Sequence, residues 1–346
     1  MQTIPRRTIL AGGLALTAPA AGTAVKVASV RRAFHNGEHN AFTDMVRFSG
    51  RMYLTFRTCP EGHMLFPSSR ILVLESENGH EWRQVHEFGV PKRDVRDPHF
   101  LVFRDRLFVY TGTWYCGDAP PKTRDMNEML GFAASSTDGR TWSGPQMLEG
   151  TYGHYIWRSA AFGGKAWLCA RRKRLFPKME DRADSVPFVQ SALLQSDDGI
   201  VFRKAGFFQE DYGNETALLF ERDGTILALA RGGGERNAEL CTARPPYSKF
   251  ERRDLGRYVG GPMIARWGSR YLAGGRRKGS PGDPVTALYW LDPAKAELAE
   301  IATLPSGGDN SYPGFIERSP TRGLLSYYST HETLKAAIFL AELEVA

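Results

Sequence analysis

Short, mostly apolar runs recur along the whole chain, each directly after a glycine or aspartate turn. Six such runs cover residues 52–57, 107–112, 166–171, 225–231, 271–275 and 324–329. Runs of this length bounded by turn residues are typical of strands rather than helices. In the first copy, neighbouring runs at 41–48, 70–75 and 83–88 complete a unit of four strands. The pattern therefore predicts an all-β protein built from six four-stranded antiparallel units.

A second repeat marks one turn of three successive units. Its copies begin at Ser76, Ser136 and Ser196, which places them 60 residues apart, and read S-x-N-G-x-x-W, S-x-D-G-x-T-W and S-x-D-G-x-x-F. Asp or Asn before Gly favours the positive φ angles of a tight hairpin turn. A fixed period of this length indicates a repeat architecture.

These turns resemble the Asp boxes of the sialidase superfamily, and six four-stranded blades are the architecture of that family. The resemblance implies a six-bladed β-propeller glycosidase that is divergent from true sialidases. The sixth copy lacks a fourth strand at the end of the chain, and residues 26–33 are available to supply it. We expect this N-terminal strand to close the last blade and leave no free sheet edge.

The N-terminal segment has the pattern of an export signal. Arg6-Arg7 forms a twin-arginine motif, and an apolar stretch of small residues follows. We expect residues 1–24 to be a twin-arginine export signal and residues 25–346 to be a single catalytic propeller domain in the periplasm or outside the cell. No later stretch reaches about 20 apolar residues, so no membrane association is expected after signal removal.

Charge and cysteine content limit the partners. The formal net charge is +7, which suits an anionic partner, but the positive residues are dispersed and no nucleic-acid motif is present. The four cysteines lack zinc spacing. Buried free thiols are expected, with a Cys59–Cys116 bridge as the alternative. The sequence predicts a monomer or small homo-oligomer.

Arginines recur at the ends of the second strands. In a propeller, these ends and the starts of the first strands converge on one face around the axis. The arginines at such positions are predicted to bind a carboxylate or another anionic group of a substrate, and they are Arg57, Arg158, Arg171, Arg231 and Arg276.

Three acids and one tyrosine lie at first-strand starts, namely Asp44, Asp97, Glu215 and Tyr312. Cleaving a glycosidic bond needs a proton donor and a nucleophile or base. Resemblance to sialidases implies that Tyr312 is the nucleophile, that Glu215 activates it, and that Arg231 and Arg276 are two arginines of the family's triad. The family's first-blade Arg-Ile-Pro motif is replaced by residues 39–44, and either Asp44 or Asp97 remains as the acid. Arg96-Asp97-Pro98-His99 also resembles the Arg-Asp-Pro motif of other propeller glycosidases.

Histidines and aromatic residues form a further group near the same face. His39 and His99 are predicted to contact substrate, with His63, His154 and His331 nearby, and Trp157 is a candidate stacking surface for a sugar. Trp114, Tyr115, Tyr155 and Tyr258 are further aromatic candidates. The histidine spacing is not diagnostic of a metal site, so metal binding by this set stays an open alternative, while no metal and no cofactor is predicted.

Three functions are consistent with these residues. The first is a glycoside hydrolase acting on a glycan that carries acidic groups, with a carboxylate acid and a Tyr/Glu nucleophilic pair. The second is a polysaccharide lyase acting on uronate-containing glycans, because Arg neutralises the uronate carboxylate while His or Tyr moves the proton. The third is a carbohydrate-binding propeller without catalysis. Fold alone does not separate them.

Overall fold

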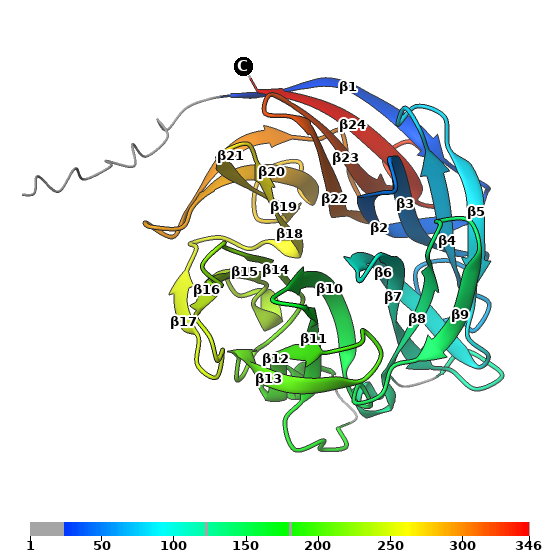
Figure 1. The fold of residues 1–346 in the computed structure, drawn as a ribbon, viewed down its shortest axis with the longest axis vertical. Helices are drawn as coiled ribbons and strands as arrows, with labels where there is room; N and C mark the ends of the chain where they lie inside the picture. The colour runs from blue at the N-terminus through cyan, green and yellow to red at the C-terminus, as the bar shows by residue number, and fades with distance from the viewer. Residues whose placement is uncertain (1–23, 122–123, 180–181, 346) are drawn as a thin grey trace, which may run out of the picture.

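The computed structural model is a six-bladed β-propeller, as the sequence predicted (Figure 1). It describes residues 24–121, 124–179 and 182–345. Each blade is one four-stranded antiparallel sheet, and the first strand of each blade lies nearest the central axis. The predicted export signal lies outside the described residues, except for residue 24, and stays a prediction.

The first three blades follow the chain order without crossovers. Blade 1 contains β2 (His39–Phe48), β3 (Arg51–Cys59), β4 (Arg70–Ser76) and β5 (Arg83–Phe88). Blade 2 contains β6 (Arg93–Phe103), β7 (Arg106–Tyr115), β8 (Leu130–Ser136) and β9 (Trp142–Met147), with the short helix η1 (Met126–Glu128) before β8. Blade 3 contains β10 (Tyr155–Phe162), β11 (Lys165–Lys173), β12 (Val189–Ser196) and β13 (Phe202–Gln209), with α1 (Arg182–Ser185) and η2 (Val186–Phe188) between β11 and β12.

The last three blades complete the ring. Blade 4 contains β14 (Thr216–Phe220), β15 (Ile226–Ala230), β16 (Glu239–Ala243) and β17 (Glu251–Asp254), with η3 (Gly233–Glu235) before β16. Blade 5 contains β18 (Gly260–Trp267), β19 (Arg270–Arg277), β20 (Val285–Asp292) and β21 (Glu297–Thr303). Blade 6 contains β22 (Asn310–Ser319), β23 (Arg322–Ser329), β24 (Ala337–Val345) and, as its outermost strand, β1 (Val25–Phe34).

Blade 6 therefore combines strands from both ends of the described chain. β1 pairs antiparallel with β24, from Val25 opposite Val345 to Phe34 opposite Ile338, and the two strands run together in Figure 1. Because β1 covers the free edge of β24, that edge is not available to another chain.

The three repeated turns share one hydrogen-bond pattern. In the second, Asp138 Oδ1 accepts from the backbone N–H groups of Arg140 and Thr141, and Ser136 Oγ accepts from Gly139 N. The indole N–H of Trp142 donates to the carbonyl of Gly139. These turns join the third and fourth strands of blades 1, 2 and 3, which places them at the end of the propeller opposite the turns between second and third strands. They serve the fold rather than the site.

A bulge recurs at one position in five blades. In blade 2, Arg96 pairs with Gly112 and His99 pairs with Tyr110, so that two residues of β6, Asp97 and Pro98, oppose one residue of β7. The same one-residue shift, in which two residues oppose one, occurs between the first and second strands of blades 1, 3, 5 and 6. A bulge re-aims a side chain at the edge of a sheet.

Buried apolar residues fill each blade and the contacts between blades. All four cysteines are buried free thiols, as expected from the sequence. Among the described residues, no helix has the length and apolar character needed to cross a membrane.

Candidate active site

One cavity of about 880 Å³ opens at the end of the propeller where the first strands begin. This volume is in the usual range for a small-molecule site. Six of the twelve predicted site residues line it: Asp97, Arg171, Glu215, Arg231, Arg276 and Tyr312. Loop residues on one side of the cavity come from the β11–β12 connection and from η3, and include Met179, Ala183, Val186 and Gly233.

Tyr312 and Glu215 are in direct contact inside the cavity. Tyr312 Oη donates to Glu215 Oε1 over 3.5 Å, although the two residues are 97 positions apart in the chain. Burial raises the pKa of Tyr312, and the Glu215 charge raises it further. The phenol therefore keeps its proton at neutral pH unless a base accepts it.

Glu215 is held as a carboxylate by two arginines. Burial opposes its ionisation, but Arg231 and Arg171 outweigh burial and lower the pKa of Glu215. Arg231 Nη1 lies 2.9 Å from Oε2, and Arg171 Nη1 lies 3.4 Å from Oε1. Glu215 is thus an ionised acceptor beside a protonated phenol.

Asp97 has the opposite character. Burial raises its pKa to about 8, the Glu215 charge adds to this effect, and the opposing charges of Arg96 and Arg171 only partly offset it. Oδ1 of Asp97 is buried and makes no hydrogen bond within the described part of the chain. A carboxyl group in this state is protonated at neutral pH and can donate a proton.

Backbone geometry aims Asp97 and Tyr312 into the cavity. Both residues occupy the first position of the recurring bulge and have a φ angle of 54°. Phe42 occupies the same position in blade 1, has a φ of 65° and also lines the cavity. Non-glycine residues with such angles cost about 1–3 kcal/mol each and are concentrated at functional sites.

Arg276 also lies close to Tyr312. Its guanidinium carbon is 5.5 Å from the centre of the Tyr312 ring. Its nitrogens donate to the carbonyl of Asn310 at 3.0 and 2.5 Å and to the hydroxyl of Tyr328 at 3.1 Å, and they pair with Asp309 at 3.5 Å. These bonds fix the orientation of the guanidinium at the cavity wall.

Asp44 does not line the cavity, contrary to the prediction that it is an alternative acid. Its Oδ2 accepts from the backbone N–H of Phe100 at 2.9 Å, and its Oδ1 pairs with Arg158 at 3.2 Å. Burial opposes ionisation of Asp44, but His99 and Arg158 outweigh it and lower the pKa of its carboxyl. An ionised, internally bonded carboxylate is unsuited to protonate a leaving group, so the geometry favours Asp97.

Arg158 and His99 also lie outside the cavity. Arg158 donates to the carbonyls of Pro262 and Pro313 at 2.9 and 2.5 Å and thereby joins blade 3 to blades 5 and 6. His99 is buried with a pKa lowered by burial to about 4, which makes it a neutral packing residue. Neither side chain is placed to contact a substrate.

Arg57, His39 and Trp157 likewise do not line the cavity, although Trp157 contacts Tyr312, which does. Arg57 is fully buried and bonds Asp94 at 2.6 Å and the carbonyls of Gly62 and Met64. Trp157 packs edge-on against the Tyr312 ring with centroids 5.2 Å apart. His39 bonds Asp309.

Several cavity residues were not predicted as site residues. Arg96 lines the cavity from the fourth position of β6, Lys173 from the last position of β11, and His63 from the β3–β4 loop. Arg96 belongs to the Arg-Asp-Pro motif and could have been found from it. Lys173 carries no sequence signal, because its place at the cavity depends on how far β11 extends. Trp114 and Tyr155, two of the aromatic candidates, are also part of the lining.

Comparison with solved structures supports the fold. A protein of unknown function from Dyadobacter fermentans has 18% identity and a TM-score of 0.77, over 93% of this chain and 100% of its own. A Trypanosoma rangeli sialidase bound to the inhibitor DANA has 13% identity and a TM-score of 0.66, over 88% of this chain. A Hadza microbial sialidase has 14% identity and a TM-score of 0.66, also over 88%.

The chain thus shares a sialidase-like propeller fold with these proteins. It spans 55% of the length of the Trypanosoma sialidase and 65% of the Hadza sialidase. No protein-family model and no curated protein sequence matches the chain.

Proposed function

We propose that the protein is a glycosidase that cleaves a glycosidic bond by a two-step mechanism with Tyr312 as nucleophile. The observation that supports this most directly is the contact of the Tyr312 hydroxyl with the Glu215 carboxylate in the cavity. A phenol with a raised pKa is a poor nucleophile unless a base takes its proton as it attacks. The ionised Glu215 carboxylate is placed to accept that proton. Arg171 and Arg231 hold this carboxylate in place.

In the first step, Tyr312 Oη bonds to the anomeric carbon while its proton moves to Glu215. The bond from that carbon to the leaving oxygen breaks, and Asp97 protonates the leaving oxygen. In the second step, water attacks the anomeric carbon, Asp97 takes a proton from the water, and the bond to Tyr312 breaks. Glu215 then returns the proton to Tyr312, so that both steps balance.

The charge of the cavity favours a sugar with an acidic group. Five arginines and Lys173 line it, against three acids, Asp97, Glu215 and Glu235. Burial keeps Asp97 neutral at pH 7, and Glu215 is the ionised acid that faces Tyr312. Arginine suits bidentate binding of a carboxylate. Arg231 and Arg276 flank Tyr312, so a carboxylate held there lies next to the reacting carbon.

The test is a product analysis on a panel of acidic and neutral glycans with the wild-type protein and Tyr312→Phe. We expect release of a reducing sugar by the wild type and a loss of about 10²-fold or more in Tyr312→Phe, because the phenyl ring cannot form the bond to sugar. Tyr152→Phe is the control, since Tyr152 is exposed. Equal activity in Tyr312→Phe and wild type would contradict the mechanism, and binding without turnover by the wild type would favour a carbohydrate-binding protein.

A polysaccharide lyase is the second candidate, because His63 lines the same cavity with Nδ1 fixed 2.7 Å from Asp309. A histidine oriented in this way can remove a proton next to a uronate carboxylate. A lyase forms an unsaturated product that absorbs in the ultraviolet, and a hydrolase does not. The same panel therefore separates the two activities.

A further inference from the structure

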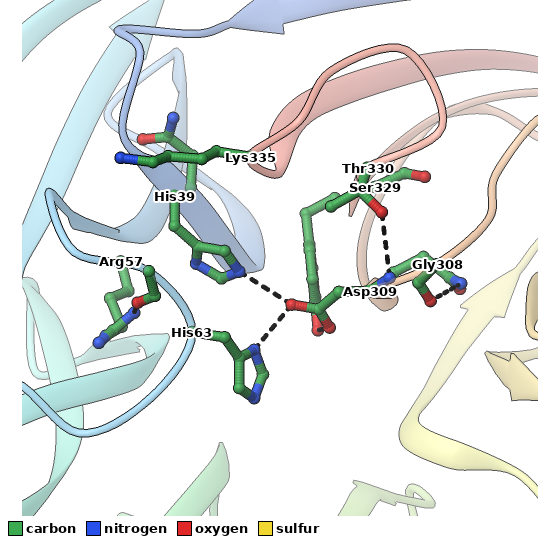
Figure 2. A network of polar contacts seen from close by, with 12 residues as sticks. His39, Arg57, His63, Gly308, Asp309, Ser329, Thr330 and Lys335 are labelled. Carbon is green, nitrogen blue, oxygen red and sulfur yellow. Dashed lines mark hydrogen bonds and ion pairs between the residues drawn. The ribbon is translucent and has the colours of Figure 1, made fainter.

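The structure brings together three potential metal ligands that the sequence keeps far apart. His39 begins β2, His63 lies in the β3–β4 loop, and Asp309 precedes β22. His39 Nε2 and His63 Nδ1 both point at Asp309 Oδ2, at 2.8 and 2.7 Å (Figure 2). The three donor atoms all lie within 4.8 Å of one another.

We propose that these residues form a binding site for a divalent transition-metal ion, with zinc as the best match. Two imidazole nitrogens and one carboxylate oxygen form a borderline donor set that suits zinc and its neighbours rather than calcium or magnesium. Zinc ligands at about 2.0–2.2 Å from the ion place donor atoms about 3.4 Å apart in a tetrahedron. The two short contacts to Asp309 therefore widen by less than 1 Å, roughly, to admit the ion.

The surroundings hold the ligands in position. The hydroxyl of Tyr328 donates to Asp309 Oδ1 at 2.9 Å, and the backbone N–H of Asp309 donates to Thr330 at 3.1 Å. The carboxylate is thus oriented through its other oxygen, which leaves Oδ2 for an ion. Partners of this kind in the outer shell are typical of metal sites.

The loop that carries His63 is fixed by two arginines. Arg57 bonds the carbonyls of Gly62 and Met64 at 3.0 and 2.9 Å, and Arg96 bonds the carbonyl of His63 at 2.8 Å. This assigns Arg57 a positioning role. The backbone around His63 is therefore fixed, which keeps its side chain positioned toward Asp309.

Access comes from the cavity. His63 lines the cavity with 44% of its side chain exposed, while the side chain of His39 is only 6% exposed. Three protein ligands leave a fourth position for water or for a substrate oxygen. The nearby charge of Arg276, 3.5 Å from Asp309, opposes a cation, so we expect a dissociation constant that is micromolar rather than picomolar.

The ligands come from blades 1 and 6, which meet where the ring closes. A bound ion therefore links the first and last blades and stabilises the folded state more than the unfolded state. Occupancy should raise Tm by about 3 °C or more at saturating zinc.

The experiment uses the full chain without a histidine tag, treated with chelator and titrated with Zn²⁺ by calorimetry and thermal denaturation. We expect one zinc per chain in the wild type. His63→Ala and Asp309→Asn should each weaken binding by at least about 10-fold and lose the Tm shift. His80→Ala, which removes an exposed histidine from a distant turn, should bind like the wild type.

His63 is partly exposed, so His63→Ala should retain the fold, as circular dichroism can verify. No zinc binding by the wild type, or undiminished binding by His63→Ala, would overturn the proposal. Calcium binding as strong as zinc binding would overturn the donor-set argument. None of these readouts depends on glycosidase activity.

Discussion

Asp97 and Tyr312 occupy the same bulge position in blades 2 and 6 and share a φ angle of 54°. The proposed proton donor and the proposed nucleophile are therefore placed by one repeated distortion of the backbone. Glu215 is placed differently, because it directly precedes β14 in blade 4, where the described ladder between first and second strands runs without a shift.

The first prediction concerns Asp97 as the acid. Asp97→Asn removes the proton donor, so turnover of a natural glycan should fall about 10²–10⁴-fold. A substrate with an activated aryl leaving group needs little protonation and should lose much less. Wild-type kcat/KM should also fall above pH 8, where Asp97 ionises. Equal losses on both substrates would contradict this role.

The second prediction concerns stability and pH. The folded chain keeps a proton on Asp97 up to pH of about 8, whereas an unfolded chain releases it near pH 4. As the pH rises from about 4 to about 8, this group therefore lowers the free energy of unfolding progressively. Tm of Asp97→Asn relative to wild type should rise across that range. A difference that does not change with pH would show that Asp97 is ionised in the folded chain.

The third prediction tests the packing of Tyr312 against the bulge of blade 5. A Cβ at Gly261 would lie 2.6 Å from the Tyr312 ring. Gly261→Ala should shift the ring and reduce kcat by about 10-fold or more, since small displacements of reacting groups are costly.

Gly268→Ala is the matched control for this variant. Gly268 has the same φ of 58°, but a Cβ there meets nothing closer than 3.7 Å. It bears the same backbone cost without the clash. Stability should fall similarly in both variants, and activity should fall only in Gly261→Ala. Comparable activity in the two variants would argue against a precise Tyr312 position.

The fourth prediction concerns the centre of the ring. Arg158→Met removes bonds to Pro262 and Pro313 and leaves the Asp44 carboxylate, whose side chain is only 14% exposed, without its charged partner. Removing one partner of a buried pair costs about 3–5 kcal/mol. Denaturant unfolding of the variant should show a loss of this size, and Arg222→Met, at an exposed site, should show almost none. A small loss in Arg158→Met would exclude a structural role.

The blades were predictable because each turn carries a local signal. Gly and Asp turns, followed by short apolar strands, repeat six times and need no knowledge of distant contacts. The positions of Asp97, Glu215 and Tyr312 at first-strand starts followed from the same repeat, and all three line one cavity. Their roles in catalysis remain a proposal.

Asp44 was misplaced because sequence does not show where a bulge falls. In blade 1, Phe42 and Thr43 form the bulge, and Asp44 follows it as His99 follows the bulge of blade 2. A shift of two residues thus separates the cavity wall from the interior. The prediction that Arg57 binds substrate was wrong for another reason. Carbonyl groups of the β3–β4 loop accept hydrogen bonds from its guanidinium, which is therefore not directed into the cavity.

The bulge of blade 5 holds a glycine where blades 1, 2 and 6 present side chains to the cavity. Since the backbone takes this shape whether the residue is Phe, Asp, Tyr or Gly, the scaffold accepts very different chemical groups at the first position of the bulge. The chemistry of such a propeller can therefore change through single substitutions at these bulge positions, with the fold of every blade unchanged.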